Sequence, residues 1–284
     1  MPCLTDLDAR LDAQTDWRET YDEQLPLAEK VANVVPLLHV TSHTDPDRAR
    51  FEDLLFEDEP VLPTSAAAHG YCSAETRKAE GILGLPHFVY MYAGRAFAGF
   101  GRVTLAFDER NFELPVEGSA CPLDSGGWAL QYIKSNLPDV GPKALRDFMT
   151  RASMDLSGWR DVFARHLAAY FTPITEYWGD GPPSRLDPEE IYAPERKNHW
   201  RAWAFEVHML AAVSPLAAIK WCISTDEYDK LVVRALSEGK LPAVGTTPLS
   251  QFLRQASIFV ENSSTDSCTE MEFWVKGKVA AALQ

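Results

Sequence analysis

The sequence lacks the features that would place it at a membrane. No apolar run among its 284 residues reaches the ~18 residues of a membrane-spanning helix. The N-terminal stretch MPCLTDLDARLD is acidic and lacks the basic-then-apolar order of a secretory signal. We therefore expect a cytoplasmic protein with no membrane partner.

Paired cysteines are also missing. The five cysteines are odd in number, widely scattered and contain no C-x-x-C spacing. This excludes a disulfide framework and a cysteine zinc site as organising principles of the fold. The cysteines are Cys3, Cys72, Cys121, Cys222 and Cys268.

Basic residues are scarce, with 27 Lys and Arg against 41 Asp and Glu and a net charge of −14. Residues 1–60 hold 15 acidic and 5 basic side chains, a difference of −10. This balance argues against a broad duplex-binding surface, because Lys and Arg make the phosphate contacts. It leaves open a local groove for one strand. An acidic N-terminal segment can also dock a basic partner, although a solvated helical face is the simpler interpretation.

The order of predicted elements gives an α+β fold, with strands at both ends of the chain and a helical insert between them. We divide the chain into an N-terminal helical segment (1–34) and a single domain (35–284), with the insert at about 110–200. Strands are predicted within 34–40, 88–94, 102–107, 201–210, 218–224, 257–260 and 271–275. Helices are predicted over 4–34, from Asp45 to about 56, and over 142–154, 157–171, 226–239 and a short piece after Thr247.

Three of these predicted strands carry unusual side chains. His39 stands in the apolar run LLHVTS, where a buried, hydrogen-bonded histidine is the ordinary interpretation. Tyr90 and Tyr92 share one face of FVYMYAGR. In CTEMEFWVKG, Glu270 and Glu272 would occupy one face of a strand whose other face is apolar, as in an edge strand kept in solution by charge.

Taken together, these segments resemble the ADP-ribosyltransferase fold. The resemblance is to its His–Tyr–Glu class, and most closely to the DarT-type toxins that modify nucleic acid. It rests on a histidine strand, a tyrosine strand that ends in Gly94-Arg95 and a late strand with Glu272-Phe273. The resemblance implies a split mixed or antiparallel sheet with flanking helices. It also implies NAD as the substrate, a nucleic-acid or protein acceptor, and a role as a toxin or phage-defence effector that an antitoxin neutralises.

The resemblance also assigns roles to residues. Cleaving the nicotinamide–ribose bond builds positive charge on the ribose, which a carboxylate stabilises. Glu272 would supply that carboxylate and Tyr90 would stack on the nicotinamide. His39 would hydrogen-bond the adenosine-side ribose. The remaining assigned residues are Glu270, which would orient the acceptor, and Thr41, Tyr92 and Arg95 on the NAD-binding side.

Several alternatives stay open. Glu206, in RAWAFEVHML beside His208, competes with Glu272 for the catalytic role, and the Glu-x-Glu spacing favours Glu272. An NAD glycohydrolase would use the same fold with water as the acceptor. A non-catalytic protein that binds partners through its acidic N-terminal segment is the alternative of a different class.

Two further stretches need an interpretation. His39 and His43, with His69 and Cys72, are metal-ligand types, but histidines four apart converge only on a helix and His39 is predicted on a strand. We therefore predict no metal site. The stretch GSACPLDSGGW (118–128) is predicted as a loop that covers the cleft or contacts the acceptor.

Overall fold

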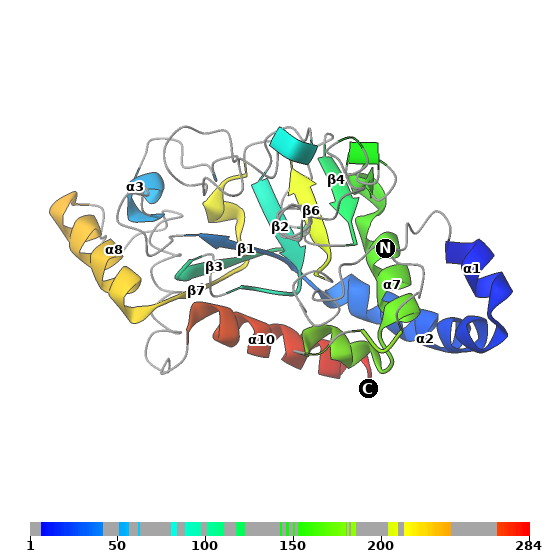
Figure 1. Ribbon diagram of the computed structural model, residues 1–284. Helices are drawn as coiled ribbons and strands as arrows, with labels where there is room; N and C mark the ends of the chain where they lie inside the picture. Colours follow the sequence, from blue (N-terminus) through cyan, green and yellow to red (C-terminus); the bar gives the residue numbers. More distant parts are fainter. Residues whose placement is uncertain are drawn as a thin grey trace.

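A computed structural model gives the arrangement of the chain (Figure 1). It describes residues 7–41, 51–56, 62, 81–83, 89–97, 101–110, 118–122, 143, 146–147, 150, 153–179, 181, 183–185, 204–209, 213–239 and 266–284.

A sheet of seven strands, antiparallel at every pairing, organises the described residues in the order β5-β4-β6-β2-β1-β3-β7. Together with the helices around it, this makes the fold α+β. The predicted strands in the first half of the chain and those at 201–210 and 218–224 are confirmed. The strands are β1 (Leu37–Thr41), β2 (Val89–Ala93), β3 (Val103–Phe107), β4 (Gly118–Cys121), β5 (Met154–Asp155), β6 (Glu206–Met209) and β7 (Lys220–Ile223).

The sheet divides between β1 and β2. All five residues of β1 pair with β3, whereas only Leu37 and Leu38 pair with β2. Beyond Leu38 the two strands separate, and Figure 1 shows β1, β3 and β7 running across the view while β2, β6 and β4 run steeply. The division opens next to His39, at the centre of the strand order.

Helices pack around both halves of the sheet. Helix α2 packs along α7, and α10 runs across β3 and β7 (Figure 1). Helices α3 and α8 contact each other at the β7 side of the molecule. The helices are α1 (Leu7–Ala13), α2 (Thr15–Val34), α3 (Phe51–Leu55), α7 (Trp159–Tyr170), α8 (Thr225–Ser237) and α10 (Ser267–Ala282), with short 3-10 turns η3 (Leu156–Gly158), η4 (Ile174–Trp178) and η7 (Pro215–Ala217).

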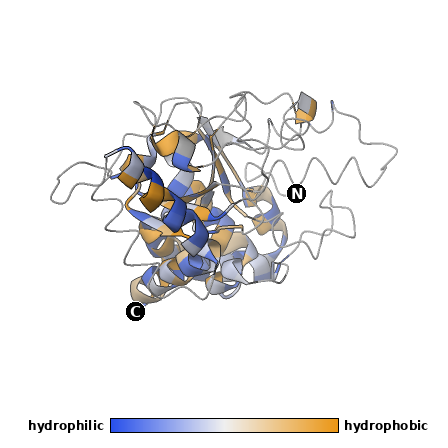
Figure 2. Ribbon diagram, turned by 90° about the vertical axis from the view of Figure 1, so that its left-hand side faces the viewer, coloured by the Kyte–Doolittle hydropathy of each residue, from blue (hydrophilic) through white to orange (hydrophobic). Residues whose placement is uncertain are grey.

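The N-terminal helices share the core of the sheet. Trp17 of α2 is buried, and its indole Nε1 donates to the Ala169 carbonyl of α7 at 2.8 Å. Leu7 and Leu11 of α1 are fully buried in the same cluster. In Figure 2 the helices change between hydrophilic and hydrophobic colours along their length, as helices with one buried face do. None of the helices in the described ranges is long and apolar enough to cross a bilayer.

The prediction of a strand over 271–275 is wrong, because these residues lie in α10. Asp266 caps this helix by accepting hydrogen bonds from the backbone N–H groups of Cys268 and Thr269, both at 3.0 Å. Met271 and Val275 are buried, as the alternation required, but Phe273 is 76% exposed. A four-residue spacing fits one helix face and also fits period two, so the short pattern does not separate the two structures.

The central insert is not wholly helical. It contributes α7, as predicted, but it also adds β4 and β5 to one edge of the sheet. The loop prediction for 118–128 is therefore wrong at its start, where Gly118–Cys121 form β4. The rest of that stretch beyond 122 lies outside the described residues. So do the helix start at Asp45, most of the helix at 142–154, the short helix after Thr247 and the strand at 257–260.

Candidate functional site

Strand β6 carries Glu206 and His208, whose side chains share one face because they are two residues apart on a strand. Tyr90 of β2 lies opposite His208 on one side, and Ser119 of β4 lies opposite it on the other. Residues in register on neighbouring strands also share a face. The sheet therefore brings one acid, one imidazole, one phenol and one hydroxyl together.

Three of these groups form a hydrogen-bonded chain, here called the Ser119–His208–Glu206 relay. The Ser119 hydroxyl lies 3.1 Å from His208 Nδ1, and His208 Nε2 lies 2.7 Å from Glu206 Oε2. His208 is 0% exposed and Glu206 is 2% exposed, whereas Ser119 is half-buried. The relay thus runs from a partly accessible hydroxyl to a carboxylate in the interior.

The partners define the direction of each hydrogen bond in the relay. An ionised carboxylate only accepts hydrogen bonds. If Glu206 is ionised and the His208 ring is neutral, the ring proton is therefore on Nε2, the nitrogen that faces Glu206. Nδ1 then presents a lone pair, and the Ser119 hydroxyl donates to it. Serine, histidine and a carboxylate in this order form the arrangement in which a base activates a nucleophile.

Gly118 sets the position of Ser119. A Cβ on Gly118 would lie 2.3 Å from the backbone oxygen of His208 and 2.8 Å from the Leu156 side chain. Any side chain there would push β4 away from β6. The glycine therefore allows the close approach that brings Ser119 within hydrogen-bonding distance of His208.

The two predicted tyrosines of β2 differ in their surroundings. Tyr90 is half-buried, and its ring meets His208 edge-on with centroids 5.1 Å apart. Tyr92 is 6% exposed and packs edge-on against Phe97 at 4.8 Å. Tyr90 therefore borders the relay, whereas Tyr92 packs into a small buried cluster beside it.

His39 lies at the division of the sheet. Its Nδ1 is 2.8 Å from the backbone oxygen of Tyr90, so this nitrogen carries the proton of the bond. Burial lowers the pKa of His39 below its usual 6.5, and the hydrogen bond to Tyr90 only partly offsets that effect. At neutral pH the ring is therefore uncharged, and Nε2 is an acceptor that suits a sugar hydroxyl. Thr41, two residues on, is 8% exposed at the end of β1.

Arg95, predicted on the NAD-binding side, ties the end of β2 to η4. Its guanidinium is 3% exposed and donates to the backbone oxygens of Tyr177 and Gly179. It also lies over the rings of Tyr177 and Phe97, at 5.5 and 5.9 Å from their centroids. These contacts make Arg95 a structural link next to the site.

Tyr177 continues that link between β2 and β6. Its hydroxyl donates to the Ala93 carbonyl at 2.9 Å and accepts from the Phe205 backbone N–H at 3.0 Å. Burial raises the pKa of Tyr177, so the phenol keeps its proton. One side chain thereby joins the end of β2 to the residue before Glu206.

Glu272 and Glu270 are placed differently from their prediction. Glu272 lies on α10, accepts the backbone N–H of Ala96 at 3.0 Å and is 4.0 Å from Arg95 Nε. Glu270 is half-buried on the same helix. Residues two apart on a helix point about 200° apart, so the two carboxylates do not face one cleft side by side as they would on a strand. The glutamate on a strand next to Tyr90 is Glu206.

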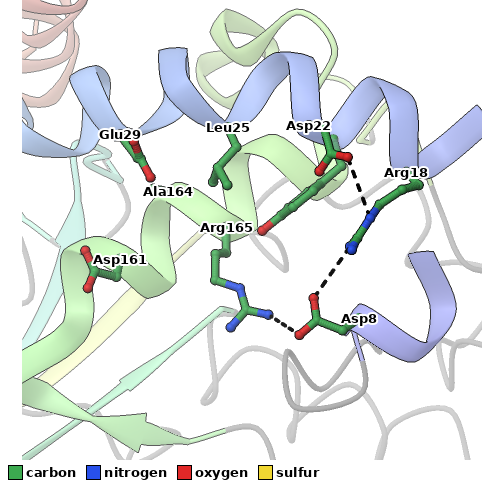
Figure 3. A pocket seen from close by; sticks show the side chains of 9 residues that line it. Asp8, Arg18, Asp22, Leu25, Glu29, Asp161, Ala164 and Arg165 are labelled. Carbon is green, nitrogen blue, oxygen red and sulfur yellow. Dashed lines mark hydrogen bonds and ion pairs between the residues drawn. The ribbon is translucent and has the colours of Figure 1, made fainter. Parts of the chain in front are cut away.

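A second charged region lies between α1, α2 and α7 (Figure 3). This hollow has a volume of about 360 Å³, and carboxylates and two arginines line it. Arg18 lies 3.6–3.7 Å from Asp8, Asp12 and Asp22, and Arg165 lies 3.3 Å from Asp8. Its charges largely pair with one another.

Sequence reasoning left Ser119 out of the site. It lay in a stretch predicted as a loop, and only its place beside β6 reveals its role. His208 was visible as the second residue of an E-x-H alternation on a predicted strand. In the part of the chain that the structure describes, no group of three or more potential ligands is arranged to hold a metal ion. His43, His69 and Cys72 lie outside that part.

The chain matches no protein-family model, no curated protein and no solved structure. The geometry of the site is therefore the basis for the function proposed below.

Proposed function

We propose that this protein cleaves the nicotinamide–ribose bond of NAD and transfers the ADP-ribosyl group to an acceptor, with Glu206 as the catalytic carboxylate. One observation carries the proposal. The strands of His39, Tyr90 and Glu206 are direct neighbours in the sheet, in the order β6-β2-β1. The three strands that carry the histidine, the tyrosine and a glutamate are thus neighbours, and this order supports Glu206 in the role first given to Glu272.

The chemistry suits these groups. Positive charge grows on the ribose as nicotinamide departs, and a carboxylate already held in position stabilises it more in the transition state than in the ground state. His208 holds Oε2 of Glu206 at 2.7 Å and so fixes the carboxylate that we assign to the ribose. The low exposure of Glu206 strengthens this electrostatic effect, because little water screens it.

Tyr90 and His39 would bind the two ends of the substrate. Tyr90 is half-buried next to His208, where its ring can stack on nicotinamide. His39 is hydrogen-bonded to the backbone of Tyr90 and can accept a hydroxyl of the adenosine-side ribose through Nε2. The acceptor, nucleic acid or protein, and a role as a toxin are parts of the proposal that the resemblance alone supports.

The test compares Glu206→Gln with Glu272→Gln. A glutamine at 206 keeps a carbonyl oxygen for His208 Nε2–H, so the fold should persist while the charge is lost. We expect nicotinamide release from NAD to fall about 10²–10³-fold in Glu206→Gln. Glu272→Gln should retain the wild-type rate, since an amide oxygen can still accept the Ala96 N–H.

The same assay defines failure. If Glu272→Gln loses activity and Glu206→Gln keeps it, the assignment of the carboxylate is wrong. If the wild-type protein releases no nicotinamide with nucleic acid, protein or water as acceptor, the enzyme proposal is rejected in favour of a binding protein.

A further inference from the structure

We propose that Ser119 is a nucleophile that takes the ADP-ribosyl group onto its own hydroxyl. This inference rests on the proposed cleavage of NAD at Glu206 and extends it to a covalent modification site. The observation behind it is the relay, in which Ser119, His208 and Glu206 are joined by hydrogen bonds of 3.1 and 2.7 Å.

Geometry favours a reactive serine over a merely structural one. With the His208 proton on Nε2 against Glu206, Nδ1 accepts from the Ser119 hydroxyl, so the serine proton points at a base. Ser119 is half-buried, whereas His208 and Glu206 behind it are 0% and 2% exposed. A structural hydroxyl needs no such base, and a base oriented by a third group is the arrangement that activates serine nucleophiles.

The proposed function supplies the electrophile, and the ribose would have to reach past His208 from the carboxylate at one end of the relay to the hydroxyl at the other. If Glu206 stabilises the ribose cation, C1′ of the ribose lies beside the carboxylate at one end of the relay. Ser119 lies on β4, directly across from His208 and one strand away from Glu206. Gly118 holds β4 against β6 at this point, so the hydroxyl cannot withdraw without separating the strands.

The atoms and electrons of this reaction balance with the groups of the site. A bond forms between Ser119 Oγ and C1′, and the bond between C1′ and the nicotinamide nitrogen breaks. Nicotinamide leaves as a neutral molecule with the bonding electron pair. The serine proton moves to His208 Nδ1, and the resulting imidazolium is stabilised by Glu206 before it returns the proton to solvent.

The experiment incubates the full-length protein with NAD and locates the product by intact mass and peptide mapping. We expect the mass of one ADP-ribosyl group on the peptide containing Ser119. The adduct should be absent in Ser119→Ala. It should persist in Ser157→Ala, a matched control whose hydroxyl bonds a carboxylate, Asp155, at 2.7 Å without an intervening histidine.

His208→Gln tests activation. Glutamine cannot accept the serine proton as a base, so the adduct should form at least about 10²-fold more slowly. If a folded His208→Gln protein forms the adduct at the wild-type rate, activation of Ser119 by His208 is ruled out. If this variant does not fold, the Ser119→Ala comparison remains decisive.

The two proposals fail in different ways. Nicotinamide release with an unmodified Ser119 peptide overturns this inference and leaves the proposed function standing. Absence of nicotinamide release overturns both. An adduct that maps to any residue other than Ser119 also overturns the inference.

Discussion

The relay and the hollow between α1, α2 and α7 both contain opposing polar groups, but they differ in their contact with water. His208 and Glu206 meet at 2.7 Å with 0% and 2% exposure. In the hollow, Arg18 is 39% exposed and its partners Asp8, Asp12 and Asp22 are 61–70% exposed. Water and salt screen the second set and not the first.

This difference indicates where chemistry can take place. A buried carboxylate acts strongly on a nearby developing charge, whereas exposed pairs contribute roughly 0–1 kcal/mol and are easily rearranged. In the acidic N-terminal segment, which suggested a docking surface, Asp8, Asp12 and Asp22 already pair with Arg18, and Asp8 also pairs with Arg165 of α7. The relay is therefore the better candidate for function.

The largest effect on stability should come from His208→Leu. The change removes the imidazole that hydrogen-bonds Glu206, and leaving a buried carboxylate without that partner costs more than the ~1–3 kcal/mol typical of a neutral group. Denaturant unfolding measures the loss. Arg102→Ala is the matched control, because Arg102 and Asp226 also lie 2.7 Å apart but are 39% and 70% exposed.

For Arg102→Ala we expect a change within about 1 kcal/mol. Equal losses in both variants would show that exposure does not distinguish the two regions, and the comparison would fail.

Tyr177→Phe should give the next largest effect. It removes a hydroxyl that serves two buried backbone groups, Ala93 C=O and Phe205 N–H, so about 1–3 kcal/mol should be lost. Because Phe205 precedes Glu206, we also expect slower nicotinamide release. Tyr228→Phe, at a half-buried tyrosine of α8, should leave both stability and rate unchanged. An unaltered thermal unfolding midpoint in Tyr177→Phe would contradict the bridging role.

Much of the fold followed from periodicity, and the exceptions have physical causes. The strands of His39, Tyr90 and Glu206 each contain a run of apolar and aromatic residues long enough to predict the strand from the sequence alone. The helix at Glu272 was mistaken for a strand because a few alternating residues fit both periods. Its Asp266 cap was the local signal that separates them.

Only some residues of the candidate site could be predicted from the sequence. Residue types suggested a histidine, a tyrosine and a glutamate, but two glutamates were candidates, and only the order of strands puts the strand of Glu206 next to the strand of Tyr90. Ser119 lies in the small-residue stretch Gly-Ser-Ala-Cys, which has weak strand propensity. Its strand forms because Gly118 fits against β6, a tertiary effect that local patterns do not contain.

A smaller effect should appear in the pH dependence of stability at His39. Burial lowers the pKa of His39 in the folded protein. At pH values below the ordinary histidine pKa of about 6.5, the unfolded chain therefore binds more protons at this residue than the folded protein does. Its contribution to stability is therefore present above pH ~6.5 and is lost as pH falls through the folded pKa. His39→Gln keeps a donor for the Tyr90 carbonyl and should flatten the pH dependence of the unfolding free energy below pH ~6.5. An unchanged slope would contradict this account.

The smallest effect should come from Arg18→Ala in the hollow. Its three ion pairs are exposed and 3.6–3.7 Å long, so the loss should stay below about 1 kcal/mol at low salt. At ~1 M salt, where the screening length is about 3 Å, the difference from wild type should vanish. The loss in His208→Leu should instead persist at the same salt concentration, because His208 and Glu206 are closed to water and ions. Paired denaturation curves at both salt concentrations measure this. A salt-independent loss in Arg18→Ala would mean that its aliphatic stem, rather than its charge, holds α1 against α2.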